Sequence, residues 1–421
     1  MSSLGERIRK FRKEKKMTLV DVAGDAMSKG MLSLIENGRS NPSMESLQHI
    51  AKQLGVNVQV LLAEESSEEM KKKLVEIEEA RQNLNNAGSL KEYDRQASWI
   101  KNELNDIFKK ELPKTYETGR FYEIAGITYL NDEKHEQAIN YLTKAIEYYN
   151  SLSLNHEVYK VQLRMVLNTF ITHNYQSAFD ELLIYKEQYK SRELVSDPLV
   201  QIESDHLEAL LLYSVGRYQE GTAKLDEIIS FSKRKNIYYL MDDIYRLASF
   251  NTLMNGDDDK TRYTLMKSRQ FADFTEKADR MVSSIFLEIH YENEYLKNHR
   301  KALQMIKDIK EDKMFGSMED SGYVNLERAR AYYGLGNIDQ AYEELKQFEF
   351  PTFAHHPFDI SMLATADAYM ALCLIEKDDP ETALVHAEKA KARVADLPET
   401  PYHHFIQETW EKTKANLDNR S

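Results

Sequence analysis

One small residue recurs about every 40 positions between residues 91 and 421, and this period restricts the fold more than any other feature. Each occurrence precedes an amphipathic helical segment, and successive intervals are 40, 43, 40, 41, 39 and 42 residues. Units of this length stack into helical arrays because a single helix pair cannot bury its own apolar face. The recurrent residues are Ala138, Ala178, Gly221, Thr261, Ala302, Ala341 and Ala383.

Composition supports a fold built from helices. The 421 residues include only 15 glycines and 8 prolines, which favours long helices over β-rich folds, so we expect an all-α protein. Cys373 is the single cysteine, which excludes an internal disulfide and a cysteine-based metal site. No run of ~18 apolar residues and no signal peptide is apparent, so we expect a cytoplasmic protein without a membrane segment.

Charge is divided unevenly along the chain. The whole sequence carries −13, but residues 1–63 hold 10 basic and 6 acidic residues, giving +4 there and −17 in the remainder. Seven of these basic residues lie between Arg7 and Lys16. A basic N-terminal segment on an acidic body indicates local attraction to phosphates, whereas the body resists nonspecific DNA binding.

Residues 17–42 have the pattern of a helix-turn-helix. Thr18 can cap a short helix, a turn follows at 24–27, and Ser28 can cap a second helix over 29–36. That helix is expected to end at Asn37-Gly38, where the backbone needs a positive φ. Flanking helices complete a unit over residues 1–63. Its expected core is Ile8, Phe11, Leu19, Val22, Leu32, Ile35, Leu47, Ile50 and Leu54.

Three segments of this unit, LGERIRKFRKEKKMT, IENG and NPSMESLQHIAKQLGV, resemble the Xre or lambda-repressor-like family. The turn is one residue shorter than in common members and lacks their glycine. The resemblance implies a DNA-binding domain whose helix at 29–36 enters the major groove, and a dimer on a two-part site. The implied contacts to bases, sugars and phosphates are Ser28, Lys29, Gly30, Ser33, Leu34, Asn37, Arg39 and Ser40.

Residues 64–90 contain one charged helical segment between polar breaks. We interpret it as a linker helix between the head at 1–63 and the array at 91–421. The alternative is that it forms the first outer helix of the array, and the sequence leaves both interpretations open.

The array resembles the tetratricopeptide repeat family, as the segments LLLYSVGRYQEGTAKLDEI and ARAYYGLGNIDQAYEELKQF illustrate. Its period of ~40 differs from the usual 34. The resemblance implies a right-handed superhelix in which the first helix of each repeat lines a concave wall. If the recurrent small residue is position 20, positions near 2, 5, 6, 9, 12 and 13 face inward. This register also places Phe250, Glu288 and Glu327 on the wall.

The inward side chains combine aromatic rings, both charge signs and several amides. An amide can donate to and accept from a peptide backbone at once, so the set suits a short peptide. The predicted peptide-binding residues are Arg164, Asn168, Asp243, Arg246, Asn251, Tyr291, Asn293, Glu294, Tyr323, Asn325 and Arg330.

Head and array together resemble the Rap/Rgg/NprR/PlcR group of peptide-pheromone receptors, with a layout closest to the NprR-like branch. The resemblance implies a cytoplasmic quorum-sensing transcriptional regulator that binds double-stranded DNA and is switched by a short signalling peptide. It also implies a homodimer or tetramer. The alternative is a repeat adaptor that binds or sequesters a protein such as a phosphorelay response regulator.

An enzyme is disfavoured by the motifs. The sequence has no G-x(4)-GK[ST] loop and no HExxH, and we identify no catalytic residue. The adjacent pairs His355-His356 and His403-His404 point apart along the chain, which favours structural roles over metal binding. We therefore expect no metal and no cofactor.

Overall fold

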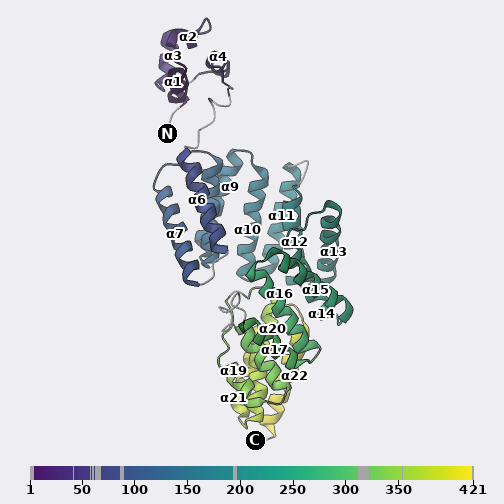
Figure 1. Cartoon of the computed structure of the whole chain (residues 1–421). Helices are drawn as coiled ribbons and strands as arrows, with labels where there is room; N and C mark the ends of the chain where they lie inside the picture. Colours follow the sequence, from purple (N-terminus) through teal and green to yellow (C-terminus); the bar gives the residue numbers. More distant parts are fainter. Residues whose placement is uncertain are drawn as a thin grey trace. The chain divides into compact units, whose positions relative to one another are not determined.

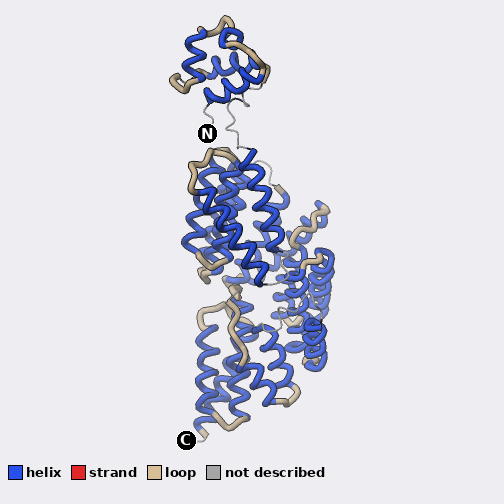
Figure 2. Tube along the Cα trace, turned by 60° about the vertical axis from the view of Figure 1, so that its left-hand side comes forward, coloured by secondary structure: helices blue, strands red, loops and turns tan. Residues whose placement is uncertain are grey.

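The computed structural model describes residues 4–40, 42–56, 58, 61, 68–85, 90–192, 197–311, 322–352 and 354–419. Every regular element in these ranges is a helix (Figure 2). The chain forms two compact units. The first comprises Met1–Asn85 and Lys91–Val161, and the second comprises Asn86–Leu90 and Gln162–Ser421. Figure 1 labels most of the helices used below.

The head consists of α1 (Leu4–Glu14), α2 (Leu19–Ala23), α3 (Lys29–Glu36) and α4 (Met44–Leu54). The predicted caps are confirmed, because the Thr18 and Ser28 hydroxyls accept hydrogen bonds from the backbones of Asp21 and Met31. Gly38 has φ +67° as expected. Seven of the nine predicted core residues are buried, and Phe11 and Leu19 pack against them partly buried.

The segment after the head packs into the array. In the first unit, α6 (Glu68–Asn85) shares an apolar core with α7 (Leu90–Phe108) and α8 (Tyr116–Asn131). Ion pairs Lys73–Glu103 at 2.8 Å and Arg120–Glu78 at 2.6 Å join the same three helices. Helix α6 thus packs directly against α7 and α8, and the assignment of residues 64–90 as a linker or as an outer helix of the array stays a prediction. Residues 62–67 and 86–89 lie outside the described ranges.

The remaining helices form consecutive antiparallel pairs, as the period predicted. A π-helical turn, η1 (Tyr291–Tyr295), directly follows α16. The other elements are α9 (His135–Ser151), α10 (Asn155–Ile171), α11 (Tyr175–Arg192), α12 (Pro198–Ser214), α13 (Tyr218–Lys235), α14 (Met241–Met254), α15 (Asp258–Thr275), α16 (Ala278–His290), α17 (His299–Glu311), α18 (Gly322–Gly334), α19 (Ile338–Lys346), α20 (Pro357–Glu376), α21 (Pro380–Val394) and α22 (Pro401–Asp418).

The recurrent small residue is the fourth residue of the second helix in all seven repeats, and it is buried each time. The site has no room for a larger side chain. A Cβ atom added to Gly221, for example, would lie 3.0 Å from the ring of Tyr213. The sequence period therefore marks the points at which paired helices cross, and the expected head followed by a helical repeat domain is confirmed.

Helix α20 is the one described helix whose length and composition would allow it to cross a membrane. Its most apolar window is 94% buried inside the protein. Ala364 and Ala368 on this helix pack against Val394 and Ile406 of α21 and α22. Packing within the array accounts for its apolar character.

Enlarging a crossing residue is expected to destabilise the second unit. Ala383→Leu forces a larger side chain into a fully buried site on α21 and is expected to cost about 1–3 kcal/mol. Val385→Leu on the same helix is the control, because Val385 is 63% exposed. Thermal unfolding followed by circular dichroism should show a lower melting temperature for the first variant alone. Equal melting temperatures would contradict the crossing-point interpretation.

Candidate functional site

The outer face of α3 is exposed and carries most of the predicted DNA contacts. Leu32 and Ile35 anchor the inner face, whereas Met31 and Leu34 are 47% and 45% exposed. Lys29 and Gly30 are exposed beside them at the start of the helix, and Ser33 is partly exposed. A short helix with an exposed mixed face can enter a groove of DNA without rearrangement.

The residues that end α3 are also accessible. The Asn37 amide donates to the Ser33 carbonyl at 2.7 Å, so this side chain folds back onto the last turn of α3. Arg39 is exposed, and the Ser40 hydroxyl lies 3.8 Å from the Met31 sulfur. Ser28 caps the start of the same helix. All eight predicted DNA-contact residues thus lie along α3 or at its ends.

A partly buried ion pair joins α1 to the last turn of α3. Arg12 donates from Nε and Nη2 to the two carboxylate oxygens of Glu36 at 2.6 and 2.8 Å, and from Nη1 to the Met17 carbonyl at 3.1 Å. The hydrogen bonds to Glu36 raise the pKa of Arg12. Arg7 is buried, and it donates to the Leu61 carbonyl at 3.1 Å. Two basic residues of the N-terminal run are therefore structural.

A cavity of about 270 Å³ lies in the second unit, where α14, α16, α18 and α20 converge. One part of its wall is apolar and the other is polar, so it can accept both kinds of group from one ligand. The apolar part consists of Phe250, Val282, Phe286, Leu287 and Met362. The polar part consists of Arg246, Ser283, His290, Tyr323, Glu327 and Asp359.

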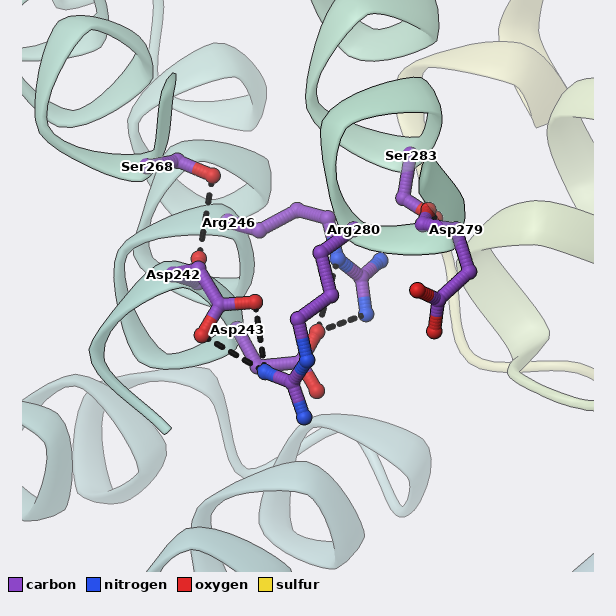
Figure 3. A pocket seen from close by; sticks show the side chains of 7 residues that line it. All are labelled: Asp242, Asp243, Arg246, Ser268, Asp279, Arg280 and Ser283. Atoms are coloured by element: carbon purple, nitrogen blue, oxygen red, sulfur yellow. Dashed lines mark hydrogen bonds and ion pairs between the residues drawn. The ribbon is translucent and has the colours of Figure 1, made fainter. Parts of the chain in front are cut away.

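A second cavity of about 240 Å³ adjoins the first, because Arg246 and Ser283 line both. Figure 3 shows Arg246 and Asp243 on α14 facing Arg280 on α16. Asp243 accepts two hydrogen bonds from Arg246 at 3.0 and 2.8 Å, and Asp242 accepts from Arg280 at 2.6 and 2.5 Å. Each guanidinium in this cavity thus already has a carboxylate partner.

Burial and pairing act in opposite directions on the Asp243 carboxyl. Burial alone would raise the pKa of Asp243, but the positive charge of Arg246 outweighs it and holds the value at about 2. The same balance applies to Glu327. Burial would raise its pKa, but the charges of Arg330 and His290 lower it to about 2. Both carboxylates are therefore ionised and paired near neutral pH.

Asp359 differs from these two carboxylates. Burial raises its pKa to about 6, and the charge of Arg246 offsets only part of that rise. Within the described ranges, no hydrogen bond or ion pair reaches its carboxyl group. The cavity therefore contains one acidic group whose counter-charge is incomplete.

The structure brings only some of the predicted peptide contacts to the cavities. Asp243, Arg246 and Tyr323 line them, whereas the other eight residues do not. Three of those eight belong to a network behind the cavity, in which Asn293 donates to Glu327 at 2.8 Å and Arg330 Nε lies 3.0 Å from Glu294. The remaining five make other contacts or are buried: Arg164, Asn168, Asn251, Tyr291 and Asn325.

Sequence reasoning missed several lining residues, and on α16 the reason is the π-helical turn. Counting back from Ala302 predicted Glu288 and Tyr291, but the cavity is lined by Leu287 and His290, one residue earlier in each case. A π turn holds one more residue than an α turn, so a count that crosses η1 is one too high. A repeat register shifted by one residue before η1 would have placed Leu287 and His290 on the inner wall.

The head is similar to known helix-turn-helix domains. Residues 8–61 match the family model described as helix-turn-helix. An immunity repressor protein from Bacillus phage phi105 is 29% identical over 147 residues, covering 35% of this chain and 83% of that protein. The HTH-type transcriptional regulator DdrOP3 of Deinococcus deserti is 47% identical over 60 residues, which is 14% of this chain and 46% of that regulator.

Two solved structures resemble a larger part of the chain. PlcR from Bacillus thuringiensis, in complex with the peptide PapR7 and DNA, aligns with a TM-score of 0.44 and 17% identity over 68% of this chain and 99% of that one. Aspartyl phosphate phosphatase F from Bacillus subtilis aligns at 0.48 and 15%, over 82% and 93%. The fold class follows from the helices and the period described above.

Removing the Asp359 charge is expected to stabilise the protein in a pH-dependent manner. Because burial raises the pKa of Asp359 from 3.8 to about 6, its ionisation costs folding free energy as pH rises through this window. The melting temperature of Asp359→Asn should equal the wild-type value near pH 4 and exceed it above pH 6. A variant that is less stable than wild type at pH 7 would contradict this assignment.

Proposed function

We propose that this chain is a cytoplasmic transcriptional regulator that binds double-stranded DNA through α3 and is switched by a short signalling peptide. In this proposal residues 1–63 form the DNA-binding domain, and residues 91–421 form the peptide-binding domain. The observation that carries it is the pair of adjoining cavities in the second unit, which combine an apolar wall with charged groups of both signs.

DNA binding is supported by charge and by the geometry of the head. The head carries +4 on a chain of −13, so a duplex is attracted to this end alone. In the proposed complex, Lys29 donates to a guanine edge, and Leu34 contacts a thymine methyl group. The two relatives described above are named as a repressor and a transcriptional regulator.

Peptide binding is supported by the size and chemistry of the cavities. Their volumes approach the lower end of the ~300–1,000 Å³ range of ligand pockets, which suits part of a short chain. A peptide carries apolar side chains and charged groups, and the lining offers matching surfaces for both. Phe250, Phe286 and Met362 form the apolar side.

Regulation follows if the peptide favours one arrangement of the protein over another. A ligand shifts an equilibrium only by its differential affinity for the two states. We propose a homodimer or tetramer in which peptide binding changes how two heads engage a two-part operator. A peptide that is released by the population and taken up again would report cell density, which makes the switch a quorum-sensing device.

Loss of two basic residues from the head is expected to weaken DNA binding. The probe is a duplex selected from a random pool by the wild-type chain. Lys29→Ala with Arg39→Ala should lower affinity by about tenfold or more and reduce the dependence on salt, because phosphate and base contacts are lost. The control is Lys233→Ala with Arg234→Ala on α13, which removes the same charge. Equal affinity of the two double variants for the duplex would exclude the exposed face of α3 as the DNA contact surface.

A peptide that fills the cavity is expected to raise the melting temperature by mass action. A pool of synthetic peptides of about 5–10 residues provides the probe. A free peptide concentration of 100 times the dissociation constant would stabilise the folded protein by about 2.7 kcal/mol. Phe286→Ala should abolish the response, whereas Phe274→Ala, at a site 86% exposed on α15, should keep it. The same response in both variants, or none in wild type, would count against the proposed cavity.

A further inference from the structure

Asp359 occupies a position from which its carboxyl group lines the cavity. It is the third residue of α20, whose first turn begins with the His356 cap and Pro357. Within the described part of the chain, the one guanidinium whose charge lowers the pKa of Asp359 is that of Arg246. This group already donates from two nitrogens to Asp243. The counter-charge that Asp359 meets is thus shared with a closer partner.

Glu327 provides an internal comparison, because it lines the same cavity. Arg330 and His290 lie 2.5 and 2.8 Å from one of its oxygens, and Asn293 donates to the other at 2.8 Å. Pairing therefore holds the pKa of Glu327 at about 2, whereas the pKa of Asp359 rises to about 6. The two carboxyls differ because Glu327 has a cation within hydrogen-bonding distance, whereas Asp359 meets only the more distant charge of Arg246.

The position of Asp359 in the helix does not remove this difference. Carboxylates are common in the first turn of a helix, where the helix dipole favours their charge. That preference accounts for the residue type, but it supplies no hydrogen-bond donor. No described backbone or side-chain group donates to this carboxyl, and burial remains the larger influence on it.

The other charges of the two cavities are compensated or exposed. Arg280 pairs with Asp242, Arg246 with Asp243, and Arg330 with Glu327. Asp279 is solvent-exposed, so water screens its charge. An anionic ligand would have to displace one of these pairs, whereas a cationic ligand would complete the pairing of Asp359.

We infer that Asp359 receives a cationic group of the peptide, either an N-terminal ammonium or a Lys or Arg side chain. A neighbouring bulky apolar residue of the peptide packs against Phe250, Phe286 and Met362. The inference rests on the proposed peptide-binding function, and it adds the class of ligand: a peptide with a positive charge beside an apolar side chain.

The test uses the full chain and three hexapeptide mixtures, all C-terminally amidated and randomised outside one fixed pair. The first mixture is N-acetylated and contains Arg beside Phe. The second replaces Arg with citrulline, which has nearly the same shape but no charge. The third keeps citrulline and leaves the N-terminus free, so it presents the ammonium as the only fixed cation. Apparent dissociation constants are measured for wild type, Asp359→Asn and the control Asp259→Asn.

Wild type should bind the first or third mixture at least about tenfold more tightly than the second, because an ion pair forms in a partly buried site. The mixture that binds more tightly identifies the source of the cation: the Arg side chain for the first mixture, or the N-terminal ammonium for the third. Asp359→Asn should reduce this gain in affinity to below about twofold. Asp259→Asn, at an exposed site on α15 that lines neither cavity, should keep it. A ligand-free melting temperature no lower than that of wild type shows that Asp359→Asn is folded.

The possible failures are distinguishable. Binding of all three mixtures with equal affinity by wild type, or a gain that persists in Asp359→Asn, overturns the assignment of Asp359 and leaves the peptide cavity standing. Binding of none of the mixtures, together with no response to the wider peptide pool, overturns both the assignment and the proposed function.

Discussion

Close approach of paired helices at one small residue per repeat is the constraint on which the array depends. A larger residue at the fourth position of α15 or α19 would separate these helices from their partners, since Thr261 and Ala341 are buried there. Regular crossing brings α14, α16, α18 and α20 close enough to enclose the two cavities. The feature that gives the sequence its period therefore also positions the candidate ligand site.

The cavities owe their chemistry to the way charge is distributed among those helices. Most buried carboxylates have a guanidinium partner on the same or a facing helix, as Asp243 has Arg246 and Asp242 has Arg280. Pairs of this kind stabilise little by themselves, but removal of one member leaves a buried charge at high cost. Asp359 is in this unpaired state before any ligand binds, which makes it the point where a cationic ligand gains most.

Local signals in the sequence were sufficient to predict the helical repeat fold and the helices of the head. The caps Thr18 and Ser28 and the seven crossing residues depend on neighbours nearby in the chain, so their patterns could be interpreted directly. The cavity was predicted only where the repeat register is undisturbed: α14 contributed Asp243 and Arg246, and α18 contributed Tyr323. On α16 the π turn shifted the register by one residue.

Other features depend on contacts that a sequence pattern does not contain. Asp359 precedes the inward positions of its repeat, so the register did not include it. Arg330 was predicted to face a peptide, but it is fully buried, and its partners come from α16, η1 and α20 as well as its own helix. Such long-range pairing becomes apparent only in three dimensions.

Reciprocal linkage is the most direct measurement of the central claim, that a peptide in the second unit controls the DNA-binding head. The affinity of the full chain for its selected duplex would be measured with and without saturating peptide, and the affinity for the peptide with and without saturating duplex. The account predicts that both affinities change by the same factor, on the order of 5- to 150-fold. If each ligand binds with an affinity that the other leaves unchanged, the two sites are independent and the account is contradicted.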